Sequence, residues 1–221
     1  MAETKAYALF DFDGTLSRGD SILPFLWYCF RHKQATVKDM WQAAMAWLDY
    51  SLKILNDTQA KELSIAFLKG KTREEAQDLA ESFYQDKLMK RIFPQGVWEI
   101  QKCREEGMEV LIITASPDVY LHTLENRLGV QGVIGTACAV DAQGKYTGAL
   151  ATPNCRGEEK TRRIREYLAQ KGHEMDEEKS RAYGNSAGDL PMMMMAGEKV
   201  AVNASARLRL ALPEAKQVQW R

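Results

Sequence analysis

The sequence has little of what marks a zinc-binding, disulfide-bonded or nucleic-acid-binding protein. Lysine and arginine total 30, as do aspartate and glutamate, so no net charge favours a general nucleic-acid surface. The few cysteines lie far apart without a C-x-x-C pair, which argues against a zinc site and a disulfide framework and predicts reduced thiols in a cytoplasmic protein. They are Cys29, Cys103, Cys138 and Cys155.

Long apolar runs are also absent. The first ten residues lack the apolar core of a secretory signal. The most apolar run, residues 22–30, is too short for a bilayer, which needs about 20 residues. We therefore expect no transmembrane segment. An apolar fraction of 45% and a charged fraction of 27% are typical of a globular protein, and 221 residues allow one domain with a small insertion.

Two aspartates follow the first predicted strand. Residues 7–10 are apolar and predict a short buried strand, and Asp11 and Asp13 come next with one residue between them. Positions i and i+2 of a strand point to the same side, so these carboxylates repel each other unless a cation lies between them. Gly14 permits a sharp turn, and Thr15 supplies a hydroxyl. An acidic pair is more often a surface turn, but a buried strand before it favours a site at the sheet's carboxyl edge.

Residues 17–90 predict helices without a strand. Residues 37–52 carry apolar side chains at helical spacing, and Thr72 with Glu75 forms a capping box for a later helix. This stretch is rich in aromatic side chains, which we interpret as the core of a small helical domain. The alternative is that such a domain rests on a membrane surface. The aromatic residues are Phe25, Trp27, Tyr28, Phe30, Trp41 and Trp47.

From residue 94 onward, helices and strands alternate. A helix over 94–107 precedes a continuous apolar strand over 109–116, as is typical of a parallel sheet buried on both faces. A strand over 132–140, a hairpin near Gly144 and a helix over 156–172 follow. The predicted fold class is therefore α/β, a doubly wound, Rossmann-type parallel sheet with an inserted all-helical domain.

Three further sets of polar residues come near the ends of predicted elements. Thr114 and Ser116 end a strand just before a helix, where hydroxyls either cap the helix or bind an anion. Lys160 lies near the start of a charged helix, where a solvated charge is the usual interpretation. Asn185 and Asp189 occupy a glycine-rich turn, in which Asp189 alone could be a helix cap.

The motif DFDGTL, residues 11–16, resembles the first signature of the haloacid dehalogenase-like phosphohydrolases. The other three sets of residues occur in the order of that family's remaining motifs. The resemblance implies that Asp11 attacks phosphorus and that Asp13 is the general acid–base. It also implies that substrate phosphate is bound by Thr114, Ala115, Ser116 and Lys160.

The same resemblance implies a Mg²⁺ site. The family's fourth motif is GDxxxD, and here GNSAGD places Asn185 where the first acid is usual. An amide oxygen can bind this hard cation, but it brings one less negative charge, so we expect weaker metal binding. Asp13 is implied to contribute its backbone carbonyl. The implied metal-binding residues are Asp11, Asp13, Asn185 and Asp189.

The resemblance further implies a core domain over 1–16 and 91–221 and a helical cap domain over 17–90. The implied enzyme is a Mg²⁺-dependent phosphatase, a phosphoric monoester hydrolase that forms an aspartyl-phosphate on a small phosphorylated metabolite. The spelling PNCRGEEK resembles the subgroup containing phosphoserine phosphatase. There, the position of Asp20 holds an acid that receives the substrate's amino group, although a helix cap is an equal alternative. If Asp20 has that role, the resemblance implies an amino- or polyol-bearing substrate. Gly188 and Ala115 depart from the subgroup's pattern, so phosphoserine is only one candidate.

Other functions stay open as alternatives. One is a phosphatidylglycerophosphate-type phospholipid phosphatase in peripheral contact with a membrane. Others are phosphoryl transfer to an alcohol and a non-catalytic phosphate-binding module in which Asn185 marks a decayed metal site. Dehalogenation is disfavoured, because Asp13 suits protonation of an alkoxide. We expect a small phosphorylated substrate and no nucleic-acid partner, and the sequence does not specify an oligomeric state.

Overall fold

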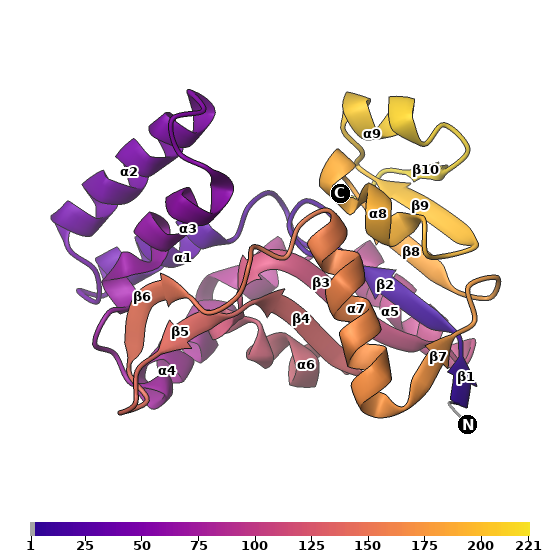
Figure 1. The fold of residues 1–221 in the computed structure, drawn as a ribbon, viewed down its shortest axis with the longest axis horizontal. Helices are drawn as coiled ribbons and strands as arrows, with labels where there is room; N and C mark the ends of the chain where they lie inside the picture. Colours follow the sequence, from indigo (N-terminus) through magenta and orange to yellow (C-terminus); the bar gives the residue numbers. More distant parts are fainter. Residues whose placement is uncertain (1–2) are drawn as a thin grey trace.

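The computed structural model describes residues 3–221 and has a six-stranded, all-parallel sheet at its centre (Figure 1). Its order reverses beside the first long strand, as in doubly wound folds, which confirms the predicted fold class. The strands, in spatial order, are β10 (Lys216–Val218), β9 (Glu198–Val202), β8 (Arg181–Gly184), β2 (Tyr7–Phe10), β3 (Glu109–Pro117) and β4 (Gly132–Thr136).

Alternate residues of the central strands belong to two different cores. Ala8 and Phe10 of β2 lie in one buried cluster, whereas Tyr7 and Leu9 lie in the other. Residues that alternate along a strand point to opposite faces, so both faces of this sheet are covered. One face packs against α5 (Pro94–Glu105) and α6 (His122–Leu128). The other packs against α7 (Glu158–Lys171), α8 (Leu190–Met193) and α9 (Ala206–Ala211).

A helical segment follows β2, and its helices begin at polar caps. Thr36 and Thr72 each form a capping box with the residue three positions later, and the box at Thr72 with Glu75 was predicted. The elements are α1 (Ile22–Arg31), α2 (Val37–Ser51), α3 (Asp57–Ile65), η1 (Ala66–Leu68), α4 (Arg73–Phe83), η2 (Tyr84–Leu88) and η3 (Met89–Arg91).

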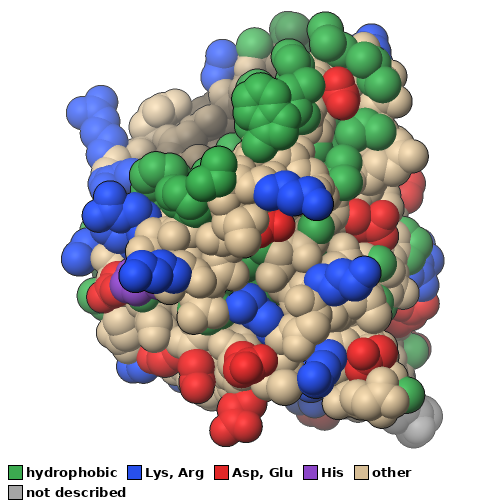
Figure 2. Space-filling view, turned by 90° about the vertical axis from the view of Figure 1, so that its left-hand side faces the viewer, with side chains coloured by type: hydrophobic (Ala, Val, Ile, Leu, Met, Phe, Trp, Pro, Cys, Tyr) green, Lys and Arg blue, Asp and Glu red, His purple; other side chains and the backbone are tan. Residues whose placement is uncertain are grey.

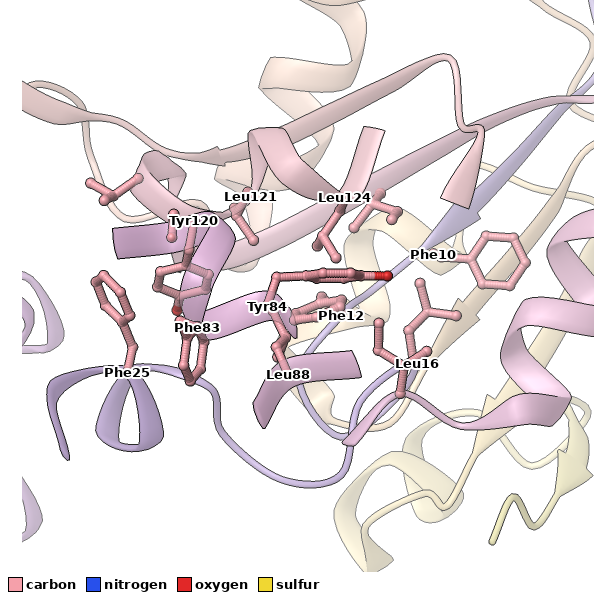
Figure 3. Packing of buried hydrophobic residues seen from close by; sticks show 14 of the residues in the cluster. Phe10, Phe12, Leu16, Phe25, Phe83, Tyr84, Leu88, Tyr120, Leu121 and Leu124 are labelled. Atoms are coloured by element: carbon pink, nitrogen blue, oxygen red, sulfur yellow. The ribbon is translucent and has the colours of Figure 1, made fainter. Parts of the chain in front are cut away.

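Aromatic side chains join the helical segment to the sheet. The Phe25 ring of α1 lies 4.9 Å from that of Tyr120, in η4 (Asp118–Tyr120), and 5.1 Å from that of Phe83 in α4. Figure 3 shows these rings continuing through Phe12 and Leu16 toward the sheet. Since one cluster spans both parts, the base of the helical segment is held by packing as well as by its two chain connections.

The aromatic residues of the helical segment do not all lie in its core, which corrects our prediction. Phe25 and Tyr28 are buried, but Trp27, Trp41 and Trp47 are 51%, 69% and 61% exposed. Helix α2 buries the small residues Ala43 and Ala46 and partly buries Met40, whereas Trp41, Trp47 and Leu48 face outward. Figure 2 shows hydrophobic side chains gathered on this side of the molecule.

The predicted strand over 132–140 is divided. Its second part, β5 (Cys138–Val140), leaves the sheet and pairs with β6 (Tyr146–Leu150) in a hairpin around Gly144. This hairpin packs on α3 and η1, so it belongs spatially with the helical segment (Figure 1). The short pair β1 (Glu3–Lys5) and β7 (His173–Met175) was not predicted. Within residues 3–221, no helix is both long and apolar enough to cross a membrane.

Candidate active site

The turn after β2 brings its two aspartates to the carboxyl edge of the sheet. The Asp11 amide donates to the Tyr183 carbonyl of β8 at 2.9 Å, which continues the sheet to the first aspartate. Gly14 has a φ of 83°, and a Cβ there would lie 2.0 Å from Asn185 Nδ2. A side chain at position 14 would therefore collide with the turn that follows β8, so glycine allows the two turns to meet.

Lys160 lies between two of the predicted acids. Its Nζ donates to Asp11 Oδ1 and to Asp189 Oδ1, each at 2.7 Å, and to the Ile113 carbonyl at 2.9 Å. All three ammonium protons have acceptors, and the side chain is only 2% exposed. The sequence alone favoured a solvated charge at this position. Instead, the first turn of α7 points the lysine into the edge where β2, β3 and β8 end.

Asp189 and Asn185 have different environments. Asp189 Oδ2 accepts from the Ser186 amide and hydroxyl at 2.9 Å, and its Oδ1 accepts from Lys160, so both of its oxygens are used within the protein. The Asn185 side chain lines the cavity and makes no hydrogen bond with any residue of the described part, 3–221. Over that same range, no three acidic, histidine or cysteine side chains converge as a metal cage.

A hydrogen-bond chain runs from Asp13 into the helical segment. Ser116 Oγ donates to Asp13 Oδ2 and shares a 3.1 Å hydrogen bond with Ser21 Oγ. Ser21 in turn bonds the Tyr120 hydroxyl at 2.9 Å. The Ser116 amide donates to Thr114 Oγ1 at 3.0 Å, so the end of β3 is folded back on itself. Neither Ser21 nor Tyr120 carried a sequence signal for a place beside the acids.

Burial and neighbouring charges shift the pKa values of the carboxyl groups in this site. Burial raises the pKa of Asp11 to about 6, the charge of Asp189 adds to this shift, and Lys160 opposes it. Burial and the charge of Asp20 raise the pKa of Asp13 to about 7. Burial acts to raise the pKa of Asp189, but Lys160 outweighs it, so that pKa lies below its ordinary value. Asp11 and Asp13 therefore both hold protons more readily than exposed aspartates do.

A cavity of about 420 Å³ opens in front of these groups and is walled on its other side by the helical segment. The segment contributes Asp20, Trp47, Asp57 and Lys61 to the lining. The candidate residues all lie on this one cavity. They are Asp11, Asp13, Asp20, Thr114, Ala115, Ser116, Lys160, Asn185 and Asp189.

Lys61 of α3 reaches across to the sheet, which the sequence did not indicate. Its Nζ donates to the Ala115 carbonyl and to the side chain of Asn154, and Asn154 donates to Asp57 Oδ2 at 2.7 Å. Burial lowers the pKa of Lys61 to about 8, although nearby carboxylates oppose that shift. A single lysine in a helix rich in polar residues gives no motif, so only the fold identifies this contact.

Replacing Lys61 with methionine should change how stability depends on pH. Below pH 8 the folded and unfolded chains both carry the ammonium, and the fold bears the cost of burying it. Between about pH 8 and pH 10.5 the unfolded chain binds more protons, so wild-type stability should rise with pH relative to Lys61→Met. Urea unfolding of both proteins across this range measures the difference. If the unfolding free energies of the two proteins changed in parallel between about pH 8 and pH 10.5, burial of the Lys61 ammonium would be contradicted.

Comparison with known proteins identifies the family of this chain. The family model described as haloacid dehalogenase-like hydrolase matches residues 8–194. A phosphoserine phosphatase from Mycobacterium tuberculosis is 30% identical over 209 residues, covering 92% of this chain and 67% of that protein. A histidinol-phosphatase from Neisseria meningitidis serogroup C is 28% identical over 221 residues, covering 98% and 97%.

Solved structures share the fold at lower identity. A protein of unknown function from Bordetella pertussis Tohama I superposes with a TM-score of 0.88 at 23% identity, covering 99% of both chains. A substrate-bound phosphoserine phosphatase complex superposes with a TM-score of 0.67 at 19% identity, covering 97% of this chain and 92% of the other. These likenesses establish the fold, helical segment included.

Proposed function

We propose that this chain, which belongs to the haloacid dehalogenase-like hydrolase family and is a phosphoric monoester hydrolase, acts on a small phosphorylated metabolite through an aspartyl-phosphate with Mg²⁺ bound. The observation that carries the proposal is Lys160 Nζ, held 2.7 Å from both Asp11 and Asp189 at the edge of the cavity. A buried cation beside a carboxylate nucleophile lowers the repulsion that a phosphate dianion would otherwise meet.

The proposed reaction has two steps. A carboxylate oxygen of Asp11 attacks phosphorus, and the bond from phosphorus to the ester oxygen breaks as Asp13 donates its proton to the leaving alcohol. Asp13 then takes a proton from water, whose oxygen attacks the phosphorus of the aspartyl-phosphate. Inorganic phosphate leaves, and the Asp11 carboxylate is restored. The raised pKa of Asp13, about 7, suits a group that first gives and then accepts a proton.

The oxygens at this edge fit a hard divalent cation. Mg²⁺ prefers carboxylate, carbonyl and amide oxygens, and we propose that Asp11, the Asp13 carbonyl and Asn185 hold it. Asn185 supports this choice because its side-chain amide lines the cavity and makes no hydrogen bond to residues 3–221. Asp189, which the resemblance also implied as a ligand, uses both of its oxygens in hydrogen bonds to Lys160 and Ser186, so we propose that it positions Lys160 instead. Bound Mg²⁺ would supply positive charge to the phosphate oxygens.

Asn185→Asp should lower the Mg²⁺ concentration needed for half-maximal activity by about tenfold, because it adds a negative charge to the proposed metal site. Asn185→Ala, which removes the oxygen, should raise that concentration. Titrating Mg²⁺ against hydrolysis of p-nitrophenyl phosphate measures both variants. A metal requirement that both substitutions leave unchanged would exclude Asn185 as a ligand.

We propose an amine-bearing phosphomonoester as substrate. Asp20 and Asp57 line the cavity from the helical segment. Asp20 Oδ1 accepts from the backbone amides of Ile22 and Leu23 at 2.9 and 3.3 Å, so the side chain caps the start of α1, as the alternative interpretation expected. Each carboxylate uses one oxygen within the protein, and we propose that the other oxygen accepts from a cationic leaving group. Two relatives are named for acting on phosphoserine and histidinol phosphate, and both of those compounds carry an amine. A Mg²⁺-supplemented screen should include these esters, phosphocholine and phosphoethanolamine, with glycerol phosphate as the control whose leaving group carries no positive charge. Preference for glycerol phosphate would contradict the proposed class.

We further propose that residues 17–90 act as a cap over a core of residues 1–16 and 91–221, so that the cap excludes water from the cavity. The contacts made by Lys61 and Asp57 across the cavity support this division. The four cysteines are all free and buried, which supports a reducing, cytoplasmic location.

The exposed apolar side chains of α1 and α2 favour a second candidate, hydrolysis of a phosphate on a membrane lipid. Trp27, Trp41 and Leu52 are all more than half exposed, which suits insertion at a lipid interface. Co-sedimentation with anionic phospholipid vesicles separates the candidates. Binding that is lost in Trp41→Ser would favour the lipid substrate, whereas a protein that stays in the supernatant would leave only the small metabolite.

A further inference from the structure

A second cavity, of about 740 Å³, lies between α1 and the turns η2 and η3, and we call it the basic groove. It shares no lining residue with the catalytic cavity among residues 3–221. A volume of this size is in the range of ligand-binding clefts. The lining residues that matter here are Trp27, Arg31, Asp86, Lys87, Lys90 and Arg91.

Positive charge in the basic groove is not neutralised by the protein. Within residues 3–221, no ion pair joins Arg31, Lys87 or Lys90 to an acid. Asp86, the one acid of the lining, accepts from the Tyr28 hydroxyl at 3.0 Å, and Lys90 reaches only the Asp86 backbone carbonyl. The molecule as a whole has no net charge. The groove is therefore a local excess of cations that favours an anionic ligand.

Arg91 has a donor without an acceptor. Its Nε is buried and makes no hydrogen bond within residues 3–221, whereas its Nη2 donates to the carbonyls of Arg18 and Asp20. A buried donor left unpaired is costly. Arg91 Nη1 also makes no hydrogen bond within residues 3–221 and is not buried, so this group can donate to a phosphate or carboxylate oxygen in the groove. Arg91 also connects the groove to the linker over 17–21, whose Asp20 lines the catalytic cavity.

The backbone and the aromatic side chains suggest the rest of the ligand. Residues Tyr84–Leu88 form a π-helical turn, a rare conformation that is often found at functional sites, and it carries Lys87 into the groove. Trp27 is half exposed beside the cations, and the His32 ring packs 4.2 Å from that of Tyr28. Aromatic faces next to positive charge suit a ligand that joins a flat ring to phosphates.

We propose that the basic groove binds a nucleoside polyphosphate, and that the bound phosphates hold the linker over 17–21 through Arg91. The binding does not rest on the proposed phosphatase reaction. It can therefore be measured without Mg²⁺ and without turnover, so that a failure of one proposal leaves the other intact.

Calorimetric titration of the full chain with ATP, in EDTA, tests the site. We expect binding that weakens about tenfold or more in Arg31→Ala/Lys87→Ala. Arg207→Ala/Lys216→Ala removes the same charge from an exposed surface elsewhere and should bind like wild type. Asp11→Asn should also keep the affinity, because its change lies in the other cavity. No binding at millimolar ATP, or equal affinity in the groove variant, would overturn the proposal.

Two further measurements test the ligand class and the coupling. Sodium tripolyphosphate should bind more weakly than ATP, and equal affinity would overturn the role of the ring. Hydrogen exchange of the amides over 17–21 should slow when ATP is bound to wild type. Exchange that ATP leaves unchanged, at a concentration that saturates the groove, would overturn the coupling through Arg91.

Discussion

Asp11→Asn should abolish phosphatase activity and leave the protein folded. The amide keeps the shape of the carboxylate but cannot attack phosphorus, so we expect kcat to fall by about 10⁴-fold. Hydrolysis of p-nitrophenyl phosphate with Mg²⁺ measures the loss. Circular dichroism and thermal unfolding verify the fold, which should persist because the Asn oxygen can still accept from Lys160 and its Nδ2 can donate to the Thr15 hydroxyl, which can accept as well as donate.

The matched control for this substitution is Asp57→Asn. Asp57 lines the same cavity and accepts a hydrogen bond from Asn154, but we assign it no part in the attack on phosphorus. It should change KM for an amine-bearing ester more than it changes kcat. Wild-type rates in Asp11→Asn would refute the proposed nucleophile and would favour a phosphate-binding module without catalysis.

Lys160→Met should cost both activity and stability. Removing the ammonium leaves the buried carboxylates of Asp11 and Asp189 facing each other without a cation. Breaking a buried ion pair from one side typically costs about 3–5 kcal/mol in the free energy of unfolding. Urea unfolding at pH 7.5 measures the cost, and the rate of phosphate ester hydrolysis should fall with it.

The same helix provides the control. Lys171→Met removes a lysine from the last turn of α7 and should change stability by less than about 0.5 kcal/mol. The double variant Lys160→Met/Asp189→Asn should recover part of the stability, because it also removes one of the unpaired carboxylates, but it should not recover activity. A single Lys160→Met variant as stable as wild type would contradict the buried pairing.

Much of the fold follows from local sequence patterns. The continuous apolar run of β3 predicts a strand buried on both faces, and Gly14 marks the turn that places Asp11 and Asp13 at the carboxyl edge of the sheet. The capping box at Thr72 fixes the start of α4 through contacts within a few residues. These features are determined by neighbours in the chain, so they can be identified without knowledge of the whole structure.

Features set by distant contacts could not be identified in this way. The burial of Lys160 depends on Asp11, 149 residues away, and Lys61 meets the Ala115 carbonyl only after the helical segment folds over the sheet. The exposure of Trp41 depends on which face of α2 packs. The apolar spacing indicated the Trp41 side, but the helix packs through Ala43 instead. The short strands β1 and β10 are too brief to leave a pattern.

The proposed catalysis requires that phosphate be attached, for a moment, to one carboxylate. Acid quenching of wild-type protein during turnover, followed by peptide mass spectrometry, should find phosphate on the peptide containing residues 7–18, at Asp11, with no such peptide in Asp11→Asn. Phosphate found on another residue of a protein that turns over at full rate would contradict attack by Asp11. The same holds if burst kinetics show that an intermediate accumulates but no phosphorylated peptide is found.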